Sequence, residues 1–81
     1  MEKRIIENTI LCLIKDELDI STDQIGLTSK LSSIGIDSIA MMTLLVFIEE
    51  KFNFTADEDI LISNRLITVS DIADYVGEKI A

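Results

Sequence analysis

Residues 35–52 read GIDSIAMMTLLVFIEEKF, and this stretch predicts a helix that begins at Ser38 and ends at Phe52. Asp37 is a good N-cap, because its carboxylate can accept hydrogen bonds from the free backbone N–H groups of the first turn. Asn53 is suited to end the helix, since Asn tolerates the left-handed conformation at that position. At about 100° per residue, five apolar side chains share one stripe with the width of a core-facing side: Met41, Leu44, Leu45, Ile48 and Phe52.

Ser38 lies away from this stripe, on a side that is partly apolar and partly acidic. That side also carries Ile39, Met42, Thr43, Val46, Glu49 and Glu50. One interpretation is that Asp37 and Ser38 only cap the helix, and that the apolar side chains pack under a loop. The other is that the patch is a docking surface, since exposed apolar patches mark interaction sites. The helical geometry alone leaves both interpretations open.

Two more long helices and one short one are predicted. Apolar residues at helical spacing indicate a first helix over residues 2–18: Ile6, Ile10, Leu13, Ile14 and Leu18. The last helix begins near Thr68, because residues 68–71 resemble a capping box with Asp in place of the usual Glu. A short turn of helix is expected at 57–62. The sequence therefore predicts an all-α fold, a small four-helix bundle with three long helices and one short helix.

The first connection, residues 19–37, is long and rich in Ser, Thr, Asp and Gly. A loop of that length in a compact domain needs anchors, and we expect them to be Ile25, Leu27, Leu31 and Ile34. Cys12 lies in the apolar run of the first helix, which predicts an inert core thiol. With 81 residues, 48% of them hydrophobic, the chain is expected to form a single domain over 1–81.

Composition argues against several classes of function. The 15 acidic and 7 basic residues give a net charge of −8, so nucleic acids and anionic membrane surfaces repel the chain, whereas basic protein patches attract it. Without His and with one Cys, the usual transition-metal sites and a Ser/His or Cys/His catalytic pair are excluded within the chain. The start lacks a signal-peptide core, and no window approaches membrane-spanning length. We therefore expect a cytoplasmic protein that is no enzyme and is not inserted in a membrane.

The segment Gly35 to Ile39 resembles the Gly-x-Asp-Ser-Leu signature of acyl carrier proteins and the related peptidyl carriers. The similarity extends along nearly the whole chain, through LSSIG at 31–35, FIEEKF at 47–52, DED at 57–59 and ITVSDIADYV at 67–76. The resemblance implies a serine that carries a 4′-phosphopantetheine arm, donated by coenzyme A and attached by a phosphopantetheinyl transferase. By position, that serine is Ser38, next to Asp37. Acyl groups would then be carried as thioesters on the thiol of the arm.

The resemblance also implies docking of partner enzymes that present basic residues around their active sites, such as acyltransferases, synthases or adenylating enzymes. We expect the carrier to act as a monomer and to bind them through apolar and acidic residues near the arm: Ile39, Met42, Val46, Glu49, Glu50, Asp57, Glu58 and Asp59. The cluster at 57–59 lacks the spaced ligands and the Gly of a calcium loop. It is better interpreted as a solvated acidic turn.

Two departures from the family pattern bear on the pathway. Carriers of fatty acid synthesis usually hold acidic residues where this chain has Ala40 and Thr43. Their absence favours a specialised carrier of a polyketide, non-ribosomal peptide or similar pathway over the housekeeping fatty acid carrier. The alternative is a peptidyl, aryl or D-alanyl carrier loaded by an adenylating enzyme, although Asp37 before the serine leans towards acyl cargo. A third hypothesis, from another class, is an unmodified helical interaction module.

Overall fold

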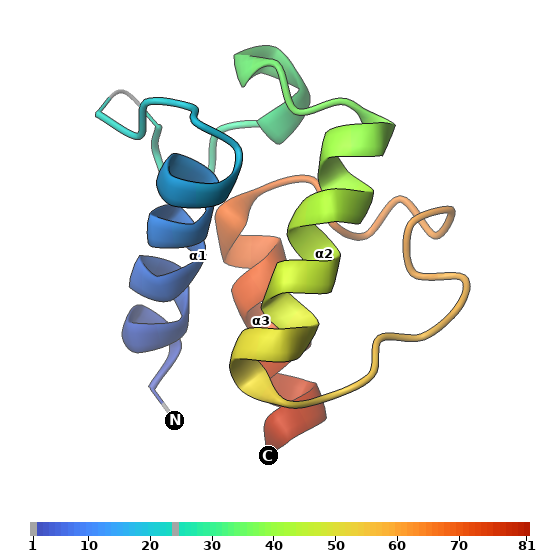
Figure 1. Ribbon diagram of the computed structural model, residues 1–81. Coiled ribbons are helices and arrows are strands. Elements are labelled where there is room, and N and C mark those ends of the chain that lie inside the picture. Colours follow the sequence, from blue (N-terminus) through green and yellow to red (C-terminus); the bar gives the residue numbers. More distant parts are fainter. Residues whose placement is uncertain (1, 24) are drawn as a thin grey trace.

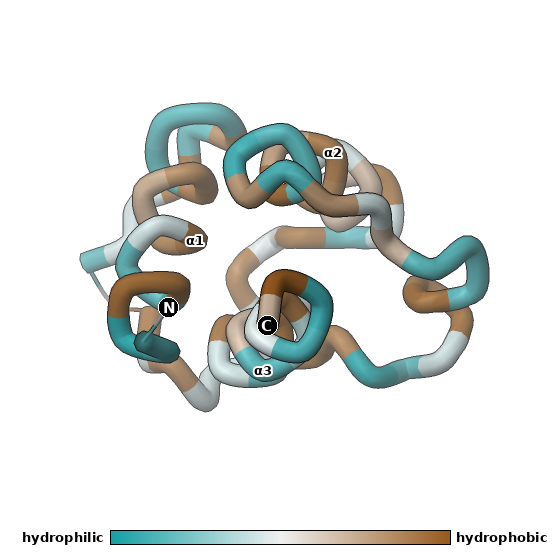
Figure 2. The backbone as a smooth tube through the Cα atoms, turned by 90° about the horizontal axis from the view of Figure 1, so that it is seen from below, coloured by the Kyte–Doolittle hydropathy of each residue, from teal (hydrophilic) through white to brown (hydrophobic). Residues whose placement is uncertain are grey.

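The computed structural model describes residues 2–23 and 25–81. In this part of the chain it contains α1 (Lys3–Glu17), a short 3-10 helix η1 (Leu31–Ile34), α2 (Ser38–Phe52) and α3 (Val69–Ile80). α1 packs against both α3 and α2, and the three α-helices surround a common interior (Figures 1 and 2). The predicted all-α fold is confirmed. None of the helices in the described ranges is long and apolar enough to cross a membrane.

The caps predicted from the sequence define the helix ends. The Asp37 carboxylate accepts a hydrogen bond from the Ala40 N–H at 2.8 Å, and Asn53 adopts the left-handed conformation, with φ of 55°. At the start of α3, Thr68 and Asp71 form a reciprocal capping box, in which each side chain accepts from the backbone N–H of the other. A side-chain cap of this kind contributes about 0.5–2 kcal/mol.

The core is almost entirely aliphatic. From the predicted stripe of α2, Met41, Leu44, Leu45 and Ile48 are buried, and Phe52 is partly buried. They belong to a core that includes buried side chains of α1 and α3: Ile6, Ile10, Ile14, Val69, Ile72, Ala73, Tyr75 and Val76. Leu13 and Leu18 are partly buried. The stripe fixes the rotation of α2 about its axis, and Ser38 is therefore on the outside.

The prediction that Cys12 is a core thiol is wrong, because this side chain is exposed. Ile10 and Ile14 are the buried residues of that part of α1. Cys12 is two positions from each of them, which at about 100° per residue places it on the opposite face. The apolar run around Cys12 therefore did not predict its burial, whereas the helical period predicts that Cys12 is exposed.

The first connection is anchored by two buried side chains, Leu31 and Ile36, and by backbone hydrogen bonds. Leu31 is buried, while Ile25 and Ile34 are partly buried, as expected for anchors. Leu27 is 40% exposed, so its predicted role as a side-chain anchor is wrong. Its carbonyl instead accepts the Ser70 N–H at 2.9 Å, and the Leu31 N–H donates to the Ile67 carbonyl at 2.9 Å. These bonds fasten the connection to the start of α3.

The short helix expected at 57–62 does not form. Residues 58–64 make successive turns, with hydrogen bonds from the Ile60 N–H to the Asp57 carbonyl and from the Ser63 N–H to the Asp59 carbonyl. Ile60 is buried but Leu61 and Ile62 are exposed, so the segment lacks the apolar face that stabilises most short helices. Asn64 is left-handed, with φ of 61°. In Figure 1 this orange segment lies to the side of α2 and α3.

Candidate functional site

Ser38 is the first residue of α2, and its side chain is exposed. A tight turn at Gly35 leads from η1 into the helix. Gly35 has φ of 94°, a conformation that glycine adopts without steric cost, and its N–H donates to the carbonyls of Leu31 and Ser32. Ile36, the next residue, is buried and anchors the turn. The chain therefore presents Ser38 at the surface from a fixed backbone.

The start of α2 has a favourable electrostatic environment for an anion on Ser38. The first hydrogen bond of the helix joins the Met41 N–H to the Asp37 carbonyl at 2.8 Å, and the Asp37 carboxylate takes the Ala40 N–H. The N–H groups of Ser38 and Ile39 precede these bonds and have no acceptor within the helix. A helix N-terminus carries roughly half a positive charge. A phosphodiester at this position would therefore be stabilised.

The outer face of α2 is apolar and open. Ile39, Met42 and Val46 are 75%, 56% and 51% exposed, so the interpretation that they pack under a loop is wrong. The loop that could have covered them is the first connection, and it is instead bonded to the start of α3. An exposed apolar patch of this kind is typical of an interaction surface.

A groove of about 820 Å³ opens beside Ser38. One wall is formed by η1 and the start of α2, including Asp37, Ser38 and Met42, and the other by the turns at 58–67. Ile62, in that second wall, is 86% exposed. Met41 lines the groove and also belongs to the buried core, so it connects the two.

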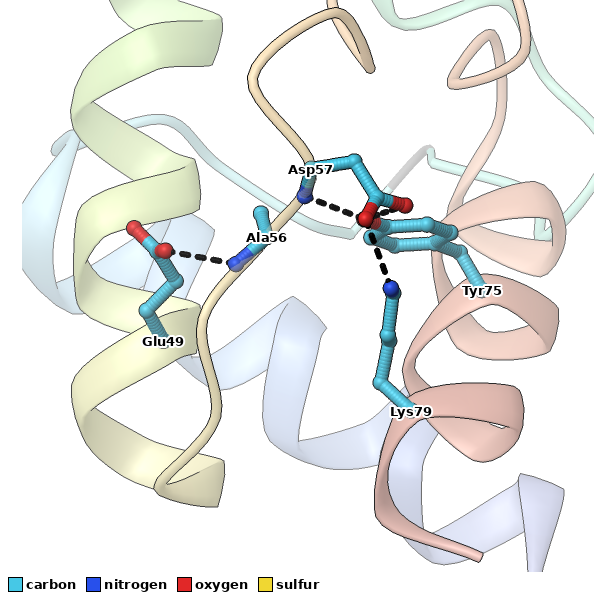
Figure 3. A network of polar contacts seen from close by, with 5 residues as sticks. All are labelled: Glu49, Ala56, Asp57, Tyr75 and Lys79. Atoms are coloured by element: carbon cyan, nitrogen blue, oxygen red, sulfur yellow. Dashed lines mark hydrogen bonds and ion pairs between the residues drawn. The ribbon is translucent and has the colours of Figure 1, made fainter.

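Two of the acidic residues expected on the partner face make internal hydrogen bonds instead of being free in solution (Figure 3). Glu49 accepts the Ala56 N–H at 2.7 Å. Asp57 pairs with Lys79 at 2.7 Å and accepts the Tyr75 hydroxyl at 2.9 Å. The Lys79 ammonium, and then the Tyr75 hydroxyl, hold the pKa of Asp57 below its ordinary value. These contacts fasten the segment after α2. Glu50, Glu58 and Asp59 are exposed, and within the described residues their side chains form no ion pair.

Tyr75 and Lys79 were not singled out by the sequence analysis. Tyr75 is 1% exposed, and burial raises the pKa of its phenol. A buried tyrosine hydroxyl usually finds a hydrogen-bond partner, and Lys79 stands one helical turn further on. The spacing of four residues indicates that Lys79 lies on the same face of α3 as Tyr75. No such spacing indicates that Asp57 is the hydrogen-bond partner of Tyr75, because it is 18 residues away in sequence.

Comparison with known proteins agrees with this geometry. Residues 8–76 match the model of a family described as a phosphopantetheine attachment site. The acyl carrier protein of Chlamydia trachomatis serovar D is 29% identical over 91% of this chain and 95% of its own length. That of Desulforapulum autotrophicum is 33% identical over 70% of this chain and 71% of its own length. The crystal structure of an acyl carrier protein from Thermotoga maritima has the same fold, with a TM-score of 0.85 and 19% identity over 98% of this chain and 91% of that chain.

The fold and the family match define a carrier domain with a phosphopantetheine attachment site. The chain belongs to the acyl carrier protein family. Members of this family are carriers and not catalysts, so the chemistry resides in the enzymes that they serve. Membership implies a phosphopantetheinyl transferase and the enzymes of a pathway as partners. The resemblance, cofactor and carrier function predicted from the sequence are confirmed.

Proposed function

We propose that Ser38 is the residue that carries the phosphopantetheine arm, and that Asp37 holds the start of α2 in place for it. The observation that carries this proposal is the position of Ser38, which is exposed at the helix N-terminus and lines the groove. The Asp37 carboxylate, bonded to the Ala40 N–H, fixes the first turn. The test is the intact-protein mass after incubation with coenzyme A and a broad-specificity phosphopantetheinyl transferase. One phosphopantetheinyl group should be added, and an unchanged mass would refute the proposal.

Acyl groups are the cargo that we favour, in a polyketide, non-ribosomal peptide or related pathway. The relatives are named acyl carrier proteins. The residues at the two positions that are usually acidic in fatty acid carriers supply no charge here: Ala40 is apolar, and the Thr43 hydroxyl donates to the Ile39 carbonyl at 3.2 Å. Partners that grip carboxylates at these positions would bind less well. A peptidyl, aryl or D-alanyl carrier remains the alternative.

The partner face that we propose consists of the apolar residues Ile39, Met42 and Val46, edged by the exposed carboxylates Glu50, Glu58 and Asp59. The apolar part supplies contact area, and the charges steer the encounter with a basic patch. A net charge of −8 supports such steering. We further infer that the chain acts as a monomeric, cytoplasmic carrier with a single domain over 1–81, in keeping with a family match that spans residues 8–76.

Charge reversal on this face should slow the transfer of the arm. The double variant Glu50→Lys and Glu58→Lys is expected to reduce the rate by about tenfold at low salt, because steering of this kind changes association rates by that order. Added salt should slow the wild type, since exposed charges are strongly screened. Glu17→Lys, on the exposed end of α1, is the matched control. Glu49 is left unchanged because it bonds Ala56. A rate indifferent to salt and to both reversals would contradict electrostatic steering.

A medium-length saturated acyl chain on the arm should raise the melting temperature above that of the unacylated holo protein. Burying its apolar surface is favourable by roughly 25 cal/mol per Å². Met41 joins the groove to the buried aliphatic residues Leu44 and Ile48 of α2. Met side chains can repack to admit such a chain. The measurement is a melting series against chain length, with methyl chemical shifts of these three residues. An aminoacyl group should give no rise, and a flat acyl series with unmoved methyls would favour the peptidyl or aryl alternative.

A further inference from the structure

Lys30 is the one basic side chain among the described residues that line the groove beside Ser38. It precedes η1, and the chain then folds back on itself, so that the Ile36 N–H donates to the Leu31 carbonyl at 3.2 Å. This bond joins residues that are next to Lys30 and close to Ser38. Lys30 is exposed, and a lysine side chain is long and flexible. Its ammonium can therefore reach the groove near the attachment residue.

The charge of Lys30 is not engaged in an ion pair within the described residues. Three other basic side chains are engaged in ion pairs, between Lys3 and Asp74, Arg65 and Glu78, and Lys79 and Asp57. Within the described ranges, no carboxylate lies within 4.0 Å of the Lys30 ammonium. Of the two carboxylates in the lining of the groove, Asp37 is bonded to the Ala40 N–H and Glu58 stands in the opposite wall. The groove thus combines a free cation with the serine that would receive an anion.

The rest of the lining suits the chemistry of the arm. Phosphopantetheine continues from its phosphodiester through a gem-dimethyl group, a hydroxyl and two amides to a thiol. The groove offers apolar surface at Met42, Ile62 and Ile67, and polar groups at Ser32 and Asn64. Such contacts are weak one by one. Because the arm is covalently tethered at the groove, its effective concentration there reaches the millimolar range, so weak contacts suffice.

We propose that Lys30 holds the arm in this groove by pairing with its phosphodiester, so that the holo protein keeps its arm against the turns at 58–67 between encounters with enzymes. The inference rests on the attachment to Ser38 proposed above and adds a positioning residue to it. Charge-assisted contacts between an ammonium and a phosphate are stronger than neutral hydrogen bonds. The structure offers a matched comparison in Lys51, an exposed lysine in the last turn of α2. It is about 20 Å along the helix from Ser38.

The experiment compares apo and holo forms of the wild type, Lys30→Gln and Lys51→Gln by methyl chemical shifts. All three carry Cys12→Ser. Cys12 is an exposed free thiol and would otherwise form disulfides with the thiol of the arm. The intact mass first shows that each holo form carries one arm, which separates a failure at Ser38 from a failure at Lys30. In the wild type and in Lys51→Gln, attachment should shift the methyl signals of Met42, Ile62 and Ile67. In Lys30→Gln, these shifts should shrink by half or more.

Three outcomes would overturn the proposal. Groove methyls that do not respond to attachment in the wild type would show that the arm lies elsewhere. Equal shifts in Lys30→Gln and the wild type would show that Lys30 does not hold it. Slower attachment to Lys30→Gln, followed by normal shifts in the completed holo form, would assign Lys30 to recognition by the transferase instead. Lys30 is exposed and forms no ion pair within the described residues, so circular dichroism should show all variants folded.

Discussion

Ser38→Ala is expected to abolish phosphopantetheine attachment completely while leaving the protein folded. In the attachment proposed above, the Ser38 hydroxyl is the nucleophile that accepts the phosphoryl group, and alanine offers no substitute. Within the described residues the Ser38 side chain makes no hydrogen bond, and it is exposed. Surface substitutions of this kind change stability by about 0.5 kcal/mol or less. The intact mass should therefore stay at the apo value, while the melting curve remains close to that of the wild type.

Ser32→Ala and Ser33→Ala are the matched controls for this prediction. Both serines are exposed in η1, a few residues before Ser38, and both variants should gain one phosphopantetheinyl group at the wild-type rate. Peptide mapping of the modified wild type should place the added mass on the segment that contains Ser38. Attachment to Ser38→Ala, or its loss in either control, would show that another hydroxyl is the acceptor.

The sequence was a sufficient guide to α2 and to the placement of Ser38, because the determinants there are local. Asp37 caps the first turn, Asn53 ends the last one, and the apolar stripe between them sets which side is buried. The stripe places Ile39, Met42 and Val46 on the side of α2 that faces away from the core. These residues are exposed only if no loop covers that side. The sequence left this second condition open. The backbone bonds from Leu27 and Leu31 to the start of α3 decided it.

The segment at 54–66 could not be predicted, because contacts distant in sequence determine it. Its acidic residues indicated a solvated turn, and part of the segment is one. Glu49 and Asp57, however, receive hydrogen bonds from residues 7 and 18 positions away, and no local pattern specifies such pairs. The expected short helix failed for a related reason, since the buried residue Ile60 packs with Leu45 and Tyr75 as a single anchor and not as one face of a helix.

Tyr75 is the residue on which this segment depends. Its ring packs with Leu45 and Ile60 in a second small core, and it stands edge-on to Phe54 with the ring centroids 6.3 Å apart. The Arg65 guanidinium lies 5.2 Å from the ring centroid. The Tyr75 hydroxyl accepts the Asp57 N–H at 2.8 Å and donates to the Asp57 carboxylate. Because the same segment forms one wall of the groove, Tyr75 supports that wall through these contacts.

Tyr75→Ala is therefore expected to destabilise the protein severely, by about 3–5 kcal/mol, the usual cost of truncating a buried aromatic residue. For a domain of this size each kcal/mol lowers the melting temperature by roughly 4–8 °C, so the variant should be largely unfolded near physiological temperature. Tyr75→Phe is the matched control. It keeps the ring and loses hydrogen bonds to a half-exposed partner, Asp57. The free energy of unfolding should therefore fall by about 1 kcal/mol. Thermal melts followed by circular dichroism measure both.

The pH dependence of these melts tests the polar half of the network. The folded pKa of Asp57 lies below its ordinary value of 3.8, first because of Lys79 and then because of Tyr75. A carboxyl with a lowered pKa contributes stability above its unfolded pKa and loses that contribution as the pH falls through the folded value. The wild type should therefore be more stable than Asp57→Asn at neutral pH, and this difference should shrink below about pH 4. A difference in stability between the wild type and Asp57→Asn that is constant down to pH 2 would show that the charge of Asp57 does not hold the segment. A Tyr75→Ala variant that melts like Tyr75→Phe would show that the ring does not hold it either.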